Sequence, residues 1–152
     1  MPFEAGPYIQ AACFCEMVLE DKEGVLSFIR LIDTVTHAQI GASPPQDMPP
    51  VPYEIKLVLM LKSGTAIGRY NLRVVPELPD GSTKDPVVLT VHLEGEERGQ
   101  NLIIRLGLTL EMEVLYWFKV YFEDQKLTQI PLRVKYNRVV TGSGTLPPNM
   151  PH

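Results

Sequence analysis

Few features of this 152-residue sequence point to secretion, membrane insertion or metal binding. The only cysteines are Cys13 and Cys15, and residues two apart on a strand lie ~6–7 Å apart, near the limit for a disulfide. We therefore expect two reduced thiols and a cytoplasmic protein. Residues 1–12 lack the basic and apolar regions of a signal peptide. No apolar run approaches the ~18 residues of a membrane-spanning helix, so we expect no membrane insertion.

The motifs of common catalytic sites are also missing. There is no G-x-S-x-G, H-E-x-x-H, P-loop or G-x-G-x-x-G. His37 lies four residues after Asp33, too far for a hydrogen bond along one strand, and no standard zinc spacing links the cysteines to His37 and His92. We expect no enzyme activity and no cofactor. An enzyme whose site is assembled from dispersed residues stays open as an alternative.

What is present is the composition of one ordinary globular domain, with 45% hydrophobic and 21% charged residues. The 14 basic and 18 acidic residues give a net charge of −4. Proteins that bind nucleic acids generally need a basic surplus, so we expect no nucleic-acid partner.

Apolar residues alternate with a period of two and are separated by turn residues, which predicts strands with one buried face. The alternation is clearest in 53–62, 87–93, 102–110, 114–122 and 130–136. We therefore predict an all-β fold, an antiparallel, hairpin-rich β-sandwich of about eight strands. It would occupy residues 9–140, after a short N-terminal arm (1–8) and before a flexible C-terminal tail (141–152). Within it we expect loops at 38–52, which is rich in proline, and at 76–86.

Three hairpins follow from this alternation. With a turn at Ser63-Gly64, residues 53–62 and 66–73 pair apolar face to apolar face, for example Leu57 with Tyr70. With a four-residue turn at 21–24, residues 9–20 pair with residues 25–35, so that Leu19 faces Leu26 and Met17 faces Phe28. Both faces of this second hairpin are partly apolar, which indicates a covered pair of strands.

In the third hairpin, a two-residue turn at Asp124-Gln125 would place core residues opposite the outer set of the next strand. Since a slip of one residue exchanges the faces, we predict a three-residue loop or a β-bulge. Phe118 would then face Leu132. Pro131 would point outward at a sheet edge or a bulge, because proline lacks the amide hydrogen of a ladder.

The stretches EVLYWFKV (113–120) and IPLRV (130–134), with Cys15, Leu26–Ile29 and Asp33, resemble a family of small bacterial proteins whose function is unknown. The resemblance covers residues 10–136. It implies a bacterial β-sandwich and supplies no reaction, cofactor or catalytic residue.

The outer face of the last three predicted strands carries the strongest candidate for a binding site. Trp, Tyr and Arg are enriched at interaction hot spots. The candidate partner-binding residues are Arg105, Trp117, Lys119, Tyr121, Arg133 and Lys135, beside Leu115. Alternatively, Trp117 packs under a loop, and Arg105, Lys119 and Arg133 pair with Glu111, Glu113 and Glu123.

We therefore expect a non-enzymatic binding module that recognises a protein partner or associates with itself. A second hypothesis is a Ca²⁺- or anion-dependent module that binds a ligand or a lipid surface. It rests on the loop from Asp80 to Asp85, although two carboxylates around a lysine are few for calcium, which takes six to eight oxygens. Asp-Gly is also a common turn signal. We expect Cys13 and Cys15 to be small buried thiols, and a metal or redox role for them stays open.

Overall fold

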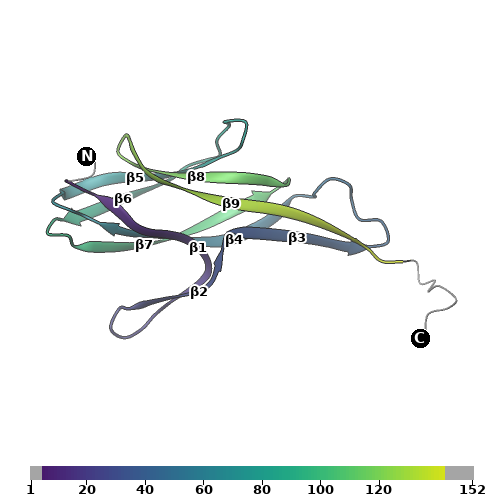
Figure 1. The fold of residues 1–152 in the computed structure, drawn as a ribbon, viewed down its shortest axis with the longest axis horizontal. Helices are drawn as coiled ribbons and strands as arrows, with labels where there is room; N and C mark the ends of the chain where they lie inside the picture. The colour runs from purple at the N-terminus through teal and green to yellow at the C-terminus, as the bar shows by residue number, and fades with distance from the viewer. Residues whose placement is uncertain (1–4, 143–152) are drawn as a thin grey trace.

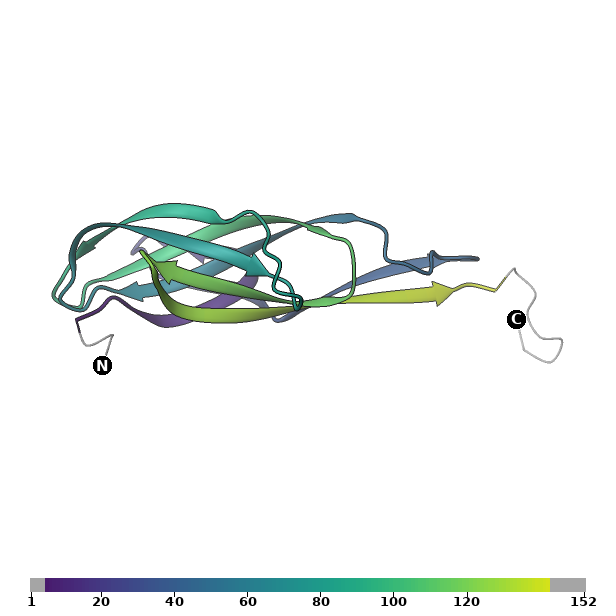
Figure 2. The ribbon, with the colours of Figure 1, turned by 90° about the horizontal axis from the view of Figure 1, so that it is seen from above.

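The computed structural model describes residues 5–142, and within that range it contains nine strands and no helix. The strands are β1 (Tyr8–Glu20), β2 (Leu26–Ile32), β3 (Thr34–Gly41), β4 (Val51–Lys62), β5 (Ile67–Glu77), β6 (Val87–Glu94), β7 (Gly99–Leu110), β8 (Val114–Phe122) and β9 (Gln125–Val140). They form a four-stranded sheet in the order β2-β1-β4-β7 and a five-stranded sheet in the order β3-β9-β8-β5-β6. The two sheets pack against each other (Figures 1 and 2), which confirms the all-β sandwich.

The ninth strand arises because the predicted strand 25–35 is divided at Asp33. Its first part, β2, pairs antiparallel with β1, and its second part, β3, pairs parallel with β9 in the other sheet. The fold is therefore not purely antiparallel. At the crossing, the amide of Arg133 donates to the carbonyl oxygen of Asp33 over 2.9 Å, which ties the crossing chain to β9.

The core lies between the sheets and is built from the alternating apolar residues. Leu57, Ile104 and Phe118, which the alternation places inside, are at most 4% exposed. Phe14 of one sheet meets Phe118 of the other in an edge-on contact. Burying side chains of this size contributes about 1.5–3 kcal/mol each, so this interior dominates the stability of the sandwich.

The predicted hairpin of 53–62 with 66–73 is wrong. The turn at Ser63-Gly64 forms, with Gly64 at a φ of 59°, but it carries the chain from one sheet to the other. β4 pairs with β1 and β7, whereas β5 pairs with β6 and β8. Both arms still direct their apolar faces into the same core, which explains why the sequence pattern fitted a hairpin equally well.

The hairpin of β1 and β2 forms, but its predicted register is wrong by one residue. Met17 pairs with Ile29 and Leu19 with Ser27. The carboxylate of Asp21 accepts hydrogen bonds from the amides of Glu23 and Val25, and the Asp21 amide donates to the Val25 carbonyl. These bonds close the loop one residue tighter than a four-residue turn.

The hairpin is also less covered than its composition suggests. β4 pairs with β1 only from Tyr8 to Cys15, and beyond that point the hairpin leaves the body of the sandwich (Figure 1). Met17 and Leu19 are each 49% exposed, and Leu31 is 64% exposed. Apolar residues on both faces of a strand pair therefore did not indicate burial.

The third hairpin, between β8 and β9, contains the predicted β-bulge, as a register shift between Val120 and Tyr121. The predicted partner of Phe118 is wrong, because Phe118 pairs with Ile130 rather than with Leu132. Pro131 is exposed and lies at a local edge, as predicted, since β3 flanks β9 only from Arg133 onward.

The loops are shorter than predicted, because β3 continues to Gly41, β4 begins at Val51, and β5 continues to Glu77. The proline-rich loop between β3 and β4 is held against β9. The hydroxyl of Tyr136 donates to the Pro45 carbonyl over 2.7 Å. Residues 1–4 of the predicted arm and 143–152 of the predicted tail lie outside the described residues.

Candidate protein-interaction face

The structure brings five of the six predicted partner-binding residues onto one surface. Trp117, Lys119 and Tyr121 alternate along β8 and point away from the core, because Tyr116, Phe118, Val120 and Phe122 point into it. Arg133 and Lys135 do the same on β9, on either side of buried Val134. We call the outward-facing side chains of β5, β8 and β9 the basic face.

Arg105 does not belong to this face, which corrects the prediction. It lies on β7, at the edge of the four-stranded sheet, and its Nε forms an ion pair with Glu54 Oε1 at 3.2 Å. The prediction assumed that β7 and β8 are neighbours because they follow each other in the sequence. The chain instead passes from one sheet to the other between these strands.

Three further cations on the basic face were missed. Arg69 and Arg73 project from β5 on the same side as Tyr121, since Arg73 pairs with Tyr121 across the ladder. Lys126 of β9 also pairs with Tyr121, and its Nζ donates to Gln129 Oε1 over 3.2 Å. The alternation along β5 already gave the two arginines outer positions, but the wrong hairpin paired this strand with β4 and not with β8.

The centre of the face is an aromatic row flanked by charge. The guanidinium of Arg73 lies over the ring of Tyr121, 4.9 Å from its centroid, a cation–π contact. Trp117 is half-buried between its ladder neighbours Glu77 and Pro131. The aromatic side chains are thus held by their neighbours on the sheet and still reach the surface.

Lys119 has the only close carboxylate partner among the cations of this face in residues 5–142. Its Nζ lies 2.8 Å from Glu77 Oε2. The hydrogen bond to Glu77 raises the pKa of the Lys119 amine, partial burial opposes the shift, and the charge of Glu77 adds to it. In the described part of the chain, no ion pair joins a carboxylate to Arg69, Arg73, Arg133 or Lys135.

The alternative ion pairs are not formed as the sequence suggested. Glu113 Oε1 instead accepts the amide of Tyr136, and Glu123 Oε1 accepts the amide of Asn71, both over 2.8 Å. These two carboxylates thus satisfy backbone donors at the two ends of β8. They mark the ends of the basic face and leave its arginines uncompensated.

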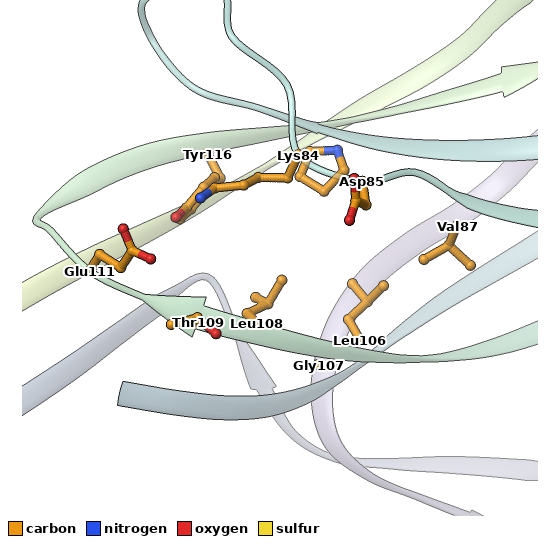
Figure 3. A pocket seen from close by; sticks show the side chains of 10 residues that line it. Lys84, Asp85, Val87, Leu106, Gly107, Leu108, Thr109, Glu111 and Tyr116 are labelled. Carbon is orange, nitrogen blue, oxygen red and sulfur yellow. The ribbon is translucent and has the colours of Figure 1, made fainter. Parts of the chain in front are cut away.

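A separate hollow of about 340 Å³ opens at the other side of the sandwich, between the edge strand β7 and the loop that leads into β6 (Figure 3). Its apolar wall includes Leu106, Leu108 and Val87, and Lys84, Asp85, Glu111 and Tyr116 surround it. The Lys84 amine and the Tyr116 hydroxyl point toward each other at one end (Figure 3). Burial, and then the charge of Glu111, raise the pKa of Tyr116. The hollow contains no histidine or arginine.

Carboxylates in the acidic loops form hydrogen bonds and ion pairs with nearby residues of the same loops. Asp80 Oδ1 accepts the amide and the hydroxyl of Ser82, over 2.9 and 2.6 Å, and these bonds lower the pKa of the Asp80 carboxyl. Glu94 and Glu96 pair with Arg98. Among residues 5–142, no three His, Cys, Asp or Glu side chains gather in a way that could hold a metal ion.

The two cysteines are free thiols, with Cys15 buried and Cys13 half-buried. Desolvation raises the pKa of both thiols, and for Cys15 the charge of Lys56 partly opposes the shift. Thiols of this kind are poor nucleophiles and metal ligands at neutral pH.

His37 contacts Gln39 through its Nε2 and stacks on Tyr136, with ring centroids 6.1 Å apart.

No protein-family model matches the chain, and no curated protein is significantly similar to it. The resemblance of residues 10–136 to a bacterial family therefore stays a prediction. Over the described range, no helix is long and apolar enough to cross a membrane.

Proposed function

We propose that this protein is a non-enzymatic interaction module that binds a protein partner through the basic face. The observation that carries the proposal is that Trp117 and Tyr121 share one sheet surface with exposed arginines and lysines. Trp, Tyr and Arg are enriched among the residues that supply most of the binding energy at protein interfaces. Trp and Tyr bury a large area at a small loss of conformational freedom.

Repulsion between like charges favours a foreign partner over a second copy bound through the same face. A two-fold contact would bring each basic face against itself. Like charges placed opposite each other cost several kcal/mol. The free thiols of Cys13 and Cys15 support a reducing compartment, so we place the interaction in the cytoplasm.

The test is capture of partners from a lysate of the source cells on the immobilised chain, with identification by mass spectrometry and confirmation with the purified partner. The double variant W117A/R133E removes the central aromatic ring and reverses one charge. The matched control, K22E/R105E, reverses two charges away from the basic face. We expect partners retained by the wild type and by the control to be lost from W117A/R133E, with all three chains equally folded by circular dichroism. Retention by W117A/R133E would contradict the proposal.

A further inference from the structure

We infer that the basic face binds a short, acidic polypeptide segment of its partner, with apolar side chains among the carboxylates of that segment. This inference rests on the proposed function. The argument begins with the distribution of charge. The outward-facing charged residues of β5, β8 and β9 are six cations and the single carboxylate of Glu77, a net charge of +5. The cations are Arg69, Arg73, Lys119, Lys126, Arg133 and Lys135.

The rest of the molecule has the opposite sign. The whole chain carries a net charge of −4, so what remains after subtracting +5 is −9. Opposite charges on two parts of one molecule orient an approaching ligand, and a compact basic field attracts acidic partners specifically. On the same side of the sheet, Glu94 lies on the neighbouring edge strand β6 and pairs with Arg98, so Glu77 is the one outward carboxylate on β5, β8 and β9.

The extent of the basic face sets the size of the segment. β8 crosses the face with nine residues, about 30 Å at the rise of an extended strand. Glu113 and Glu123 stand at the two ends of β8. An extended segment of about nine residues would fit between them without meeting either carboxylate.

These end carboxylates favour an acidic peptide over a nucleic acid. A nucleic acid carries one charge per phosphate and extends past the face, so its backbone would run into Glu113 or Glu123 and into a molecule that is otherwise strongly acidic. A short segment of protein ends before those positions. It can also place apolar side chains against Trp117, Leu115 and Val75, which are half-buried along the middle of the face.

Trp117 provides a direct signal for the experiment, because it is the single tryptophan of the chain. The probe is a synthetic nine-residue peptide in which five glutamates alternate with four leucines, and its matched control carries glutamine in place of every glutamate. Binding is followed through Trp117 fluorescence at low salt and at 0.3 M NaCl. A 12-nucleotide oligouridine and vesicles containing phosphatidylserine are tested in parallel.

We expect the glutamate peptide to bind at least about tenfold tighter than the glutamine peptide, and to lose about tenfold in affinity at high salt. R133E/K135E should lose at least about tenfold, whereas K22E/R105E, with the same change in net charge, should change by less than about twofold. Equal effects of the two variants, or equal affinity for the two peptides, would overturn the inference. Tighter binding of oligouridine or vesicles would overturn it in favour of that ligand.

The outcome separates this inference from the proposed function. If W117A/R133E loses the captured partner while the glutamate peptide fails to bind, the face is an interaction site and only the acidic character of its partner is wrong. If the captured partner is retained by W117A/R133E, the proposed function itself fails, whatever the peptides do.

Discussion

The ring of Phe14 in the four-stranded sheet meets the ring of Phe118 in the five-stranded sheet edge-on, with centroids 5.0 Å apart and ring planes inclined at 70°. Both side chains are at most 1% exposed, so this pair joins the two layers at the centre of the core. We expect F118A to lower the free energy of unfolding by about 3–5 kcal/mol, because it removes a large buried side chain and leaves a cavity.

Urea denaturation measures this loss, and a double-mutant cycle with F14L isolates the aromatic contact. Edge-on aromatic pairs contribute about 0.5–1.5 kcal/mol beyond their buried area. The control L31A removes a side chain that is 64% exposed, and it should change stability by less than about 0.5 kcal/mol. Equal losses for F118A and L31A would show that Phe118 is not in the core.

A second prediction concerns the crossing at Gly64. This glycine has a φ of 59°, and a Cβ added to it would lie 2.8 Å from the Ala5 carbonyl oxygen. G64A should therefore destabilise the protein by about 1–3 kcal/mol, from left-handed backbone strain and displacement of the N-terminal segment.

Gly107 of β7 provides the matched control, because its added Cβ would meet nothing within 4 Å. G107A should be neutral, or stabilising by about 0.5 kcal/mol, since alanine restricts the unfolded chain more than glycine does. Thermal unfolding of both variants decides the matter. If G64A melts with the wild type, the close approach between residues 5 and 64 is not present in solution.

The sequence was sufficient for the fold class and for most strands, because apolar alternation reports which side chains face the core. Alternation does not report which sheet a strand joins. Residues 55–61 and 70–74 face the same interior whether they pair with each other or oppose each other across it. The predicted hairpin at Ser63-Gly64 failed for this reason, although its turn residues were identified correctly.

The same ambiguity explains the mixed result for the candidate site. Trp117, Tyr121 and Arg133 lie on strands that pair through a tight turn, so their common face followed from local pattern. Arg105 was assigned to that face, and Arg73 was placed in a hairpin with residues 53–62, because which strands pair depends on long-range contacts. The acidic Glu77, which binds Lys119, comes from the end of a strand predicted as loop, and no local signal placed it beside β8.

A third prediction follows from the Lys119–Glu77 pair. The pKa of Lys119 is raised in the folded protein, so the folded state holds this proton more tightly than the unfolded state does. The stabilisation by the Lys119–Glu77 pair is fully present below the pKa of 10.5 that Lys119 has in the unfolded chain. It is lost as the pH rises through the higher pKa that Lys119 has in the folded protein. The stability advantage of the wild type over E77Q should therefore shrink as the pH is raised from about 9 to about 11.5.

Urea denaturation of both proteins across this range measures the difference. Tyr116 also has a raised pKa, which destabilises both proteins as it ionises, and comparing wild type with E77Q removes that shared effect. A difference that stays constant with pH would mean that Glu77 does not hold the Lys119 proton in the folded state.

The fourth prediction concerns the hairpin of β1 and β2, whose outer half pairs with no other strand of residues 5–142. β4 stops pairing with β1 at Cys15, and the free edge of β2 is interrupted at Arg30, which has a φ of 56° and forms an ion pair with Glu16 at 2.9 Å. Two-stranded hairpins are marginally stable in water. We therefore expect local opening of this segment without unfolding of the sandwich.

Hydrogen exchange at single-residue resolution should show amides of residues 17–19 exchanging at least about 100-fold faster than those of residues 57–59, which lie in the centre of the same sheet with neighbours on both sides. Exchange should be independent of protein concentration if the exposed side chains of Met17 and Leu19 stay in water. Slowing at higher concentration would show that a second copy covers them, because association protects whatever it buries. Equal protection of the two segments in dilute solution would contradict the geometry of the hairpin itself, since no strand within residues 5–142 is available to hold it.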